Sequence, residues 1–248
     1  IVLKKIIKLK KKYFIIDLSK NNKFKKNINS NRISIGKFGK IINLIKEKKS
    51  KKVLFAGKIA KPKFSTLRLD LKGIYYMPSV IKAAKSGDAA IIKAIIKILE
   101  KEKIKVISSN FFNPELSLKA KNYTKLKPHS KEIKSIKKGV LYFNQLNSLD
   151  HIQALIVKDE KVIATEGNQG TKKMLSKLKK GSAGILIKLP KKKQDLRMDL
   201  PTIGLNTLKD CMKCGLKGIV LKSKKNIFLD KEKCISFANK NKIFIKII

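Results

Sequence analysis

The sequence predicts an α/β protein built from two small domains, each with a mainly parallel sheet. Short apolar runs of strand length alternate with segments of helical periodicity in both halves of the 248 residues, a pattern typical of βαβ units. Hydrophobic residues make up 43% of the chain, which is enough for a packed core. The pattern fades over residues 116–131, as it does in linkers. We therefore expect an N-terminal α/β domain over residues 1–115 and a C-terminal α/β domain over residues 132–248.

The N-terminal half reads as strands and helices in alternation. Phe38, Ile41, Ile42 and Ile45 follow the one-face spacing of a helix that opens at Gly36. Asp88 suits a helix N-cap because its carboxylate can accept from exposed backbone amides. In chain order we expect a helix over 1–12, strands over 13–18, 33–35 and 53–56, a helix over 89–101 and a strand over 105–107.

The C-terminal half begins again with a helix and continues as strands. We expect a helix over 133–146, a strand pair over 154–158 and 162–164, a helix after Thr171, and strands over 185–189, 218–221, 227–229 and 243–248. Ligands of open α/β sheets bind beyond the carboxyl ends of the strands. The loops 165–171 and 190–202 both leave strands at such ends, so we expect them to converge.

The net charge of +44 is extreme, with 61 basic residues against 17 acidic ones. Nearly all the basic residues are lysines spread evenly along the chain, whereas proteins that read bases favour arginine with interleaved aromatic residues. We therefore expect no nucleic-acid partner, and RNA binding is only a third hypothesis. The charge does predict attraction to anionic partners, such as nucleotides and acidic membrane surfaces.

The three cysteines are predicted to be free thiols in a reducing compartment. Cys211 and Cys214 form a lone C-x-x-C motif without a second pair, while a zinc site needs about four ligands. We interpret them as buried apolar groups in a short helix that ends at Gly215. The sequence contains no apolar run of about 18 residues and no cleavable signal, so we expect a cytoplasmic protein.

The run from Lys188 to Gly204 is the most informative part of the chain. It contains Asp195 and Asp199, two of the few acidic residues, and Arg197, one of only three arginines. An arginine offers a fixed planar fork that suits phosphate or carboxylate. The segment D-L-P-T-I-G then reads as the entry to a helix. This combination predicts an anion site beside a catalytic or metal-binding carboxylate.

Several segments together resemble the LpxI-type UDP-2,3-diacylglucosamine pyrophosphatases of lipid A synthesis. The resemblance follows nearly the whole chain in order, and its strongest member is Q-D-L-R-M-D-L-P-T-I-G. The other segments are I-G-K-F-G-K-I (35–41), F-A-G-K-I-A-K-P-K-F (55–64), K-S-G-D (85–88), L-D-H-I-Q-A (149–154) and A-T-E-G-N-Q-G-T (164–171).

The resemblance implies a hydrolase of two α/β domains, with the C-terminal one catalytic. Such enzymes use Mg²⁺ to split the pyrophosphate bond of UDP-2,3-diacylglucosamine. Water attacks the phosphorus nearer the sugar and releases UMP and 2,3-diacylglucosamine 1-phosphate, called lipid X. The family holds this lipid between its domains. The resemblance also implies peripheral association with the cytoplasmic face of the inner membrane, and it makes a homodimer plausible.

Within the family motif the leading aspartate is essential for catalysis, and here it is Asp199. Both roles that a carboxylate can have, metal ligand and water-orienting base, stay open for it. Gln194 and Arg197 match the polar positions just before it and are assigned to substrate binding. Asp195 is expected to be solvated rather than metal-bound.

Three further side chains are candidates for substrate, and one for the metal. Thr171 is either a phosphate ligand at a helix start or a simple N-cap. Lys188 ends a strand at the expected ligand face, and Thr202 lies within D-L-P-T-I-G. Glu166 is a possible second metal carboxylate, or else an exposed loop acid. The Gly36 and Gly39 pair is weak evidence for a nucleotide loop.

The chain departs from the family pattern in two places. The family opens with a strand and a glycine-rich loop, whereas this sequence begins at the first helix, so the family's N-terminal strand is expected to be missing. Ile152 stands where the family tends to carry glycine, which puts Asp150 and Gln153 in doubt. A second hypothesis for the function is a non-catalytic module that binds nucleotide or acidic lipid through its basic surface.

Overall fold

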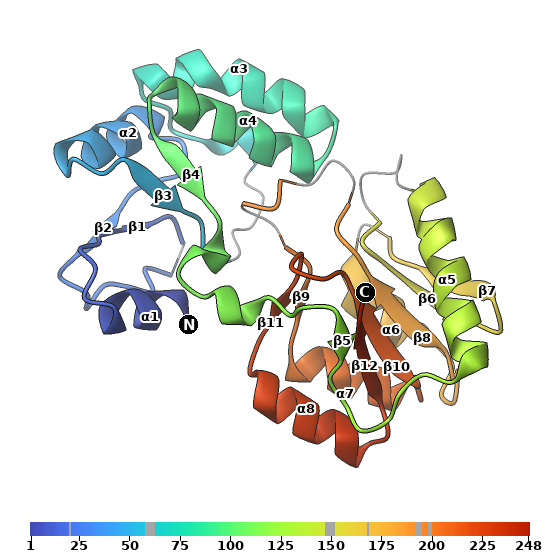
Figure 1. Ribbon diagram of the computed structural model, residues 1–248. Helices are drawn as coiled ribbons and strands as arrows, with labels where there is room; N and C mark the ends of the chain where they lie inside the picture. The colour runs from blue at the N-terminus through green and yellow to red at the C-terminus, as the bar shows by residue number, and fades with distance from the viewer. Residues whose placement is uncertain (20, 58–62, 147–151, 168, 192–194, 198–199) are drawn as a thin grey trace. The chain divides into compact units, whose positions relative to one another are not determined.

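The computed structural model describes residues 1–19, 21–57, 63–146, 152–167, 169–191, 195–197 and 200–248. The chain forms two compact units, Ile1–Asn113 and Pro114–Ile248, and each is described by itself (Figure 1). Both units combine helices with sheets that are parallel in the N-terminal unit and parallel or mixed in the C-terminal unit, which confirms the predicted α/β class. No helix in the described part of the chain combines the length and the apolar character needed to cross a bilayer.

The described residues of the N-terminal unit form two small parallel sheets and four α-helices. β1 pairs with β2, and β3 pairs with β4, both in parallel. The elements are α1 (Val2–Lys8), β1 (Ile15–Asp17), β2 (Ser30–Arg32), α2 (Phe38–Glu47), β3 (Lys52–Leu54), α3 (Leu71–Lys85), α4 (Asp88–Lys101) and β4 (Lys105–Ile107), with 3-10 turns η1 (Phe64–Thr66) and η2 (Ser109–Phe111).

Helix α3 packs only one of its faces against the core of this unit. Met77 and Val80 are buried there with Ile98 of α4, against partly buried aromatic residues that include Phe38 of α2. Helix α3 was not predicted from the sequence, since Pro78 lies inside it and proline usually interrupts a helix. Tertiary packing of the apolar face stabilises the helix in spite of that proline.

Two corrections concern helix starts and the linker. Asp88 is the first residue of α4, and the N-cap is Gly87 with φ +101°, a left-handed conformation that glycine adopts without strain. The segment 116–131, expected to be a linker, instead contributes β5 (Lys121–Asn122) to the sheet of the C-terminal unit. The apolar pattern fades there because β5 has only two residues.

Glu102 joins three helices of the N-terminal unit. It follows α4, and its carboxylate lies 2.5 Å from the Lys46 Nζ of α2 and 2.5 Å from the Lys72 Nζ of α3. The Tyr76 hydroxyl donates a third hydrogen bond at 3.0 Å. Hydrogen bonds from the two lysines lower the pKa of Glu102 from 4.5 to about 2, although burial opposes this shift.

We expect Glu102→Gln to lower the free energy of unfolding at pH 7 by about 1–2 kcal/mol, since the partly exposed lysines limit the effect. Because the folded pKa is depressed, the contribution is complete above pH 4.5 and is lost as the pH falls towards 2. The difference between the urea midpoints of the parent chain and the variant should therefore shrink over that interval. Glu47→Gln, at an exposed position of α2, is the control, and an equal loss there would contradict the assignment.

The C-terminal unit is built on a six-stranded mixed sheet in the order β5-β12-β10-β8-β6-β7. β8, β10 and β12 are parallel, while β5, β6 and β7 run antiparallel to their neighbours. Its elements are η3 (Pro114–Leu116), α5 (Ser130–Gln145), β6 (Ala154–Lys158), β7 (Lys161–Thr165), α6 (Gly170–Ser176), β8 (Ile185–Lys188), β9 (Thr202–Ile203), α7 (Leu205–Lys213), β10 (Gly218–Leu221), β11 (Ile227–Phe228), α8 (Lys231–Lys240) and β12 (Phe244–Ile247).

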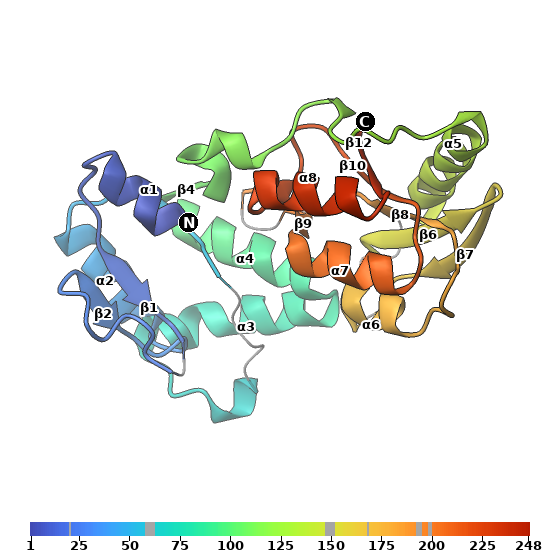
Figure 2. The ribbon, with the colours of Figure 1, turned by 90° about the horizontal axis from the view of Figure 1, so that it is seen from below.

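Alternate residues of the sheet face two separate hydrophobic clusters. Ile156, Leu186 and Ile219 pack with residues of α6, α7 and α8 on one face, and these three helices lie side by side in Figure 2. Leu155 and Ile187, from the opposite face, pack with residues of α5. The sheet is therefore covered on both sides, which explains why its strands read as continuous apolar runs.

Candidate functional site

Three strand ends meet at one edge of the C-terminal sheet. Ala154, at the start of β6, lies opposite Lys188, at the end of β8, and Leu155 lies opposite Thr165, at the end of β7. Since β6 is antiparallel to both neighbours, the carboxyl ends of β7 and β8 share this edge. The loops that follow these two strands therefore begin at the same edge, as the sequence predicted.

Glu166, the first residue after β7, is the centre of this edge. It is buried, with 6% of its surface exposed. Its Oε2 accepts a hydrogen bond from the backbone amide of Gln153 at 2.8 Å, and its Oε1 accepts one from the Thr171 hydroxyl at 2.6 Å. Its own amide donates to the Ala154 carbonyl at 2.9 Å. Glu166 is therefore a buried organising carboxylate, and the expectation of an exposed loop acid was wrong.

Thr171 and Lys188 extend the network towards the end of β8. The Lys188 ammonium donates to the Thr171 Oγ1 at 2.9 Å, so the threonine hydroxyl bridges a cation and the Glu166 carboxylate. Thr171 is the second residue of α6, whose N-cap is Gln169, so the N-cap interpretation of Thr171 was wrong. The physical reason is that Glu166 and Lys188 already use its hydroxyl. Glu166, Thr171 and Lys188 are called the edge triad below.

Asp195 and Arg197 form a local ion pair in the loop after β8. The Arg197 Nε lies 3.0 Å from the Asp195 Oδ1, and its NH2 lies 2.8 Å from the Oδ2. The Arg197 amide also donates to the Asp195 Oδ1 at 3.0 Å, which closes a tight turn. Only 15% of the Asp195 side chain is exposed, so it is paired rather than solvated as expected. The pair holds the guanidinium in a fixed orientation, which would favour phosphate binding. Phosphate binding by Arg197 stays a prediction.

Of the remaining residues predicted to form the site, the structure describes Thr202 but not Gln194 or Asp199. Thr202 begins β9 and is exposed, and its hydroxyl donates to the Leu200 carbonyl at 3.0 Å. Gln194 and Asp199 lie outside the described residues, as does Asp150. The expected helix entry is confirmed, because Gly204 is the N-cap of α7.

The described residues offer few ligands for a metal ion. No group of three or more His, Cys, Asp or Glu side chains gathers anywhere within them. Glu166 supplies carboxylate oxygens, the donors that Mg²⁺ prefers, and each oxygen keeps a lone pair beyond its one hydrogen bond. The oxygen donors of the edge triad are therefore of the type that Mg²⁺ binds. A second carboxylate ligand would have to come from Asp199.

The cysteines lie in the core as buried apolar groups. Cys211, Cys214 and Cys234 are free and buried. Burial raises the pKa of the Cys211 and Cys214 thiols, and it raises the pKa of Cys234 to about 11. Thiols in this state are poor nucleophiles and poor metal ligands at neutral pH. The interpretation of the C-x-x-C motif as packing is confirmed for these residues.

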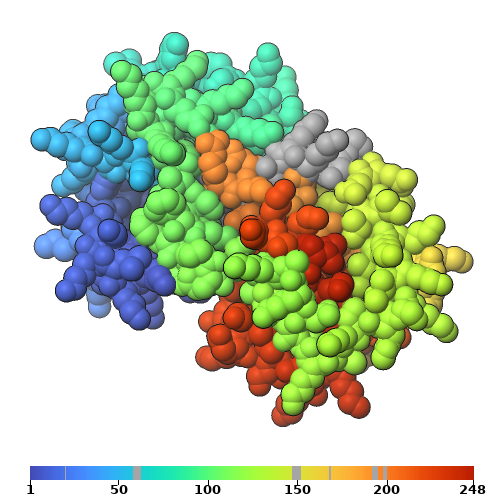
Figure 3. Space-filling view, in the orientation of Figure 1, coloured from blue at the N-terminus to red at the C-terminus, as the bar shows by residue number. Residues whose placement is uncertain are grey.

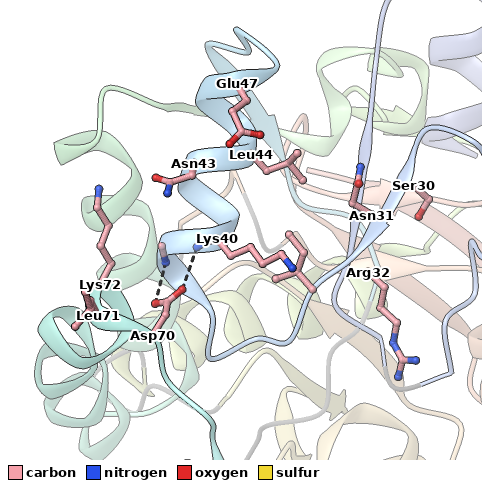
Figure 4. Close-up of a pocket in the computed structure, with 12 residues that line it drawn as sticks. Ser30, Asn31, Arg32, Lys40, Asn43, Leu44, Glu47, Asp70, Leu71 and Lys72 are labelled. Carbon is pink, nitrogen blue, oxygen red and sulfur yellow. Dashed lines mark hydrogen bonds between the residues drawn. The ribbon is translucent and has the colours of Figure 1, made fainter.

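A pocket of about 760 Å³ lies in the N-terminal unit between β2, α2 and the start of α3. Its lining includes three basic side chains, Arg32, Lys40 and Lys72, as well as Glu47 (Figure 4). Asp70 also lines it, but its carboxylate accepts from three backbone amides and is thereby committed to structure. Lys72 is paired with Glu102, so Arg32 and Lys40 are the basic side chains that suit an anionic group, and the volume suits one of nucleotide size.

Asp70 was missed by the sequence analysis, and it explains the glycines of this region. It caps α3 through Gly73 N at 2.8 Å and also accepts from Gly39 N and Lys40 N of α2, each at 3.0 Å. A Cβ on Gly73 would approach the Gly36 carbonyl oxygen to 2.5 Å. The glycines therefore allow two helix starts to approach closely, and the signal for Asp70 was the D-L-K-G spacing of a helix N-terminus.

Comparisons with known proteins cover both units. The model of the LpxI N-terminal domain matches residues 1–116, and the model of the LpxI C-terminal domain matches residues 119–246. The chain belongs to the LpxI family. It is 31% identical over 223 residues to the UDP-2,3-diacylglucosamine pyrophosphatase LpxI of Caulobacter vibrioides, a match that covers 86% of this chain and 80% of the relative. In this LpxI family member the boundary between the matched domains agrees with that between the compact units.

Proposed function

We propose that this LpxI family member hydrolyses the pyrophosphate bond of UDP-2,3-diacylglucosamine, releasing UMP and 2,3-diacylglucosamine 1-phosphate. The observation that carries the proposal is the match to both LpxI domains along nearly the whole chain. The named activity of the Caulobacter relative supports the same reaction. The edge triad adds chemical support, since it places a lysine and an ordered hydroxyl where parallel strands end.

The described side chains would act mainly by binding and orienting the diphosphate. Lys188 supplies positive charge at the sheet edge, and Thr171 and Glu166 fix its position through consecutive hydrogen bonds. Arg197, held by Asp195, supplies a second oriented cation in the next loop. Hydrolysis of a phosphoanhydride depends largely on such charge neutralisation and on the placement of the attacking water.

Asp199 is proposed to be the catalytic carboxylate, and Asp199 with Glu166 would hold Mg²⁺. When bound, the ion would neutralise charge on the phosphoryl oxygens. Gln194, Thr171, Thr202, Lys188 and Arg197 are proposed to contact the substrate. The proposal for Asp199 rests on its place in the D-L-P-T-I-G motif.

Hydrolysis in ¹⁸O-labelled water tests both the activity and the bond that is cleaved. We expect UMP release from UDP-2,3-diacylglucosamine in detergent with Mg²⁺, and its loss when EDTA removes the ion. Attack at the phosphorus nearer the sugar would place the label in the lipid phosphate and leave UMP unlabelled. Label in UMP would overturn the proposed point of attack.

The second hypothesis, a non-catalytic binding module, makes a different prediction for the same assay. It is favoured by the cationic pocket between β2 and α2, which has the size for a nucleotide. UMP would then bind, but no UMP would be released from the substrate with any divalent ion. That outcome would reject the hydrolase proposal and support the binding module.

A further inference from the structure

Helix α3 leaves a continuous apolar stripe at the surface of the N-terminal unit. Leu71 is 87% exposed, Ile74 60%, Tyr75 74% and Ile81 42%. With exposed Pro78 they occupy positions i, i+3, i+4, i+7 and i+10 of the helix, so they share one face. These five residues are called the α3 stripe, and Figure 3 shows the segment of α3 and α4 at the surface in teal and green.

The stripe is separate from the apolar residues that hold α3 in place. Gly73, Met77 and Val80 are the buried residues of the helix. At 100° per residue, those three fall in an arc on the opposite side from the stripe. A helix that needs only its core-facing side for folding thus carries a second apolar face, about 15 Å long, in contact with solvent. Contiguous exposed apolar surface of this kind marks an interaction site.

The charges around the stripe indicate what it contacts. Helix α3 contains no acidic residue, and its last turn carries Lys82 and Lys85. Both lysines fall within the arc of the stripe, beyond Ile81, so any partner meets apolar side chains and ammonium groups together. A second copy docked on the same face would add like charges to one interface, since α3 carries Lys82 and Lys85 and no carboxylate to pair with them. An anionic phospholipid surface is complementary to both features.

We propose that the α3 stripe is a membrane-docking surface that lies in the headgroup region of an anionic bilayer. Leu71, Ile74 and Ile81 enter the acyl boundary, and Tyr75 lies at the interface, where amphipathic aromatic rings are favoured. Lys82 and Lys85 bind the phosphates of anionic headgroups. This proposal rests on the proposed function in one respect: a diacylated substrate lies in a bilayer, so an enzyme that hydrolyses it must reach the bilayer surface.

The absence of tryptophan from the sequence allows a direct test. Tyr75→Trp puts a single fluorescent reporter in the stripe, and Tyr142→Trp puts one on α5, at a residue that is 38% exposed. Each full-length variant is mixed with phosphatidylcholine vesicles containing phosphatidylglycerol, with and without brominated acyl chains. We expect a blue shift and strong quenching at position 75 and neither at position 142.

A partition measurement at about 0.5 M salt separates insertion from adhesion by lysines, because the Debye length is then only about 4 Å. The double variant Leu71→Ser, Ile74→Ser should partition at least about tenfold more weakly than the parent chain, since it loses two inserted apolar side chains. Leu141→Ser, at an exposed residue of α5, should change partition by less than about twofold.

Three outcomes would overturn the docking surface. Quenching at position 75 that is no stronger than at position 142 would show that the stripe does not insert into the bilayer. A dimer in sedimentation with the reporter at position 75 already blue-shifted would indicate that a second copy covers the stripe. The same shift in a monomer would indicate that another part of the chain covers it. None of these measurements uses substrate, so they stand whether or not the chain hydrolyses UDP-2,3-diacylglucosamine.

Discussion

Asp199→Ala is expected to lower the rate of UMP release by about 10²–10⁴-fold, the range typical of a lost acid–base group. The alanine can neither orient water nor bind a cation, so the diphosphate would retain its binding contacts but lose the chemical step. We therefore expect the loss in kcat rather than in KM. The measurement is steady-state UMP release from UDP-2,3-diacylglucosamine with saturating Mg²⁺.

A matched aspartate variant controls for general effects of the lost charge. Asp159 lies in the exposed turn between β6 and β7, at the opposite edge of the sheet from the edge triad. Asp159→Asn should retain activity within about twofold, as substitutions at exposed positions usually do. Unchanged turnover in Asp199→Ala would reject Asp199 as the catalytic residue, whatever the fate of the proposed reaction.

Glu166→Ala is expected to combine a large loss of stability with a loss of activity. The substitution deprives the Gln153 amide and the Thr171 hydroxyl of their acceptor in a buried position. An unsatisfied buried donor costs about 1–3 kcal/mol, so we expect the free energy of unfolding to fall by about 2–4 kcal/mol. Thr171, which accepts the hydrogen bond from Lys188, is then no longer held by Glu166, so UMP release should fall at least about tenfold. Urea denaturation and the UMP assay provide the two measurements.

Two other glutamate variants show whether position or charge matters. Glu166→Gln keeps the shape and one acceptor oxygen, so it should retain part of the lost stability. Glu232→Ala removes an exposed carboxylate in the first turn of α8 and should change stability by less than about 0.5 kcal/mol. A fully stable and fully active Glu166→Ala would show that the edge triad is not required for folding or for turnover.

Much of the C-terminal sheet could be predicted from the sequence because its strands are buried on both faces. The predicted strands at 154–158 and 218–221 match β6 and β10. The short strands β5 (K-N) and β9 (T-I) were not predicted, because neither lies in an apolar run like the I-F-L segment that indicated β11. In the N-terminal unit the predicted strand at 33–35 lies at 30–32, a shift that follows from its polar sequence S-N-R.

The site was predictable in outline but not in its contacts. The convergence of the loops at the strand ends follows from the order and direction of the strands, which the apolar runs of the sequence indicate. The hydrogen bond from Gln153 to Glu166 joins the residue before β6 to the residue after β7, and the β6–β7 register brings them together. The ion pair of Arg197 with Asp195 joins residues only two positions apart in the sequence. It was not predicted because it depends on the tight turn that these residues form.

The carboxylate of Asp70 has one more consequence, for the way the N-terminal unit comes apart. Because a single side chain is the shared anchor of the α2 and α3 starts, neither helix can fray from that end without releasing the other. Burial raises the pKa of Asp70, but the hydrogen bonds from three backbone amides together outweigh burial and lower the pKa, so the anchor is ionised at neutral pH. Opening of these two helices should consequently be concerted, with hydrogen exchange reporting one shared event instead of two.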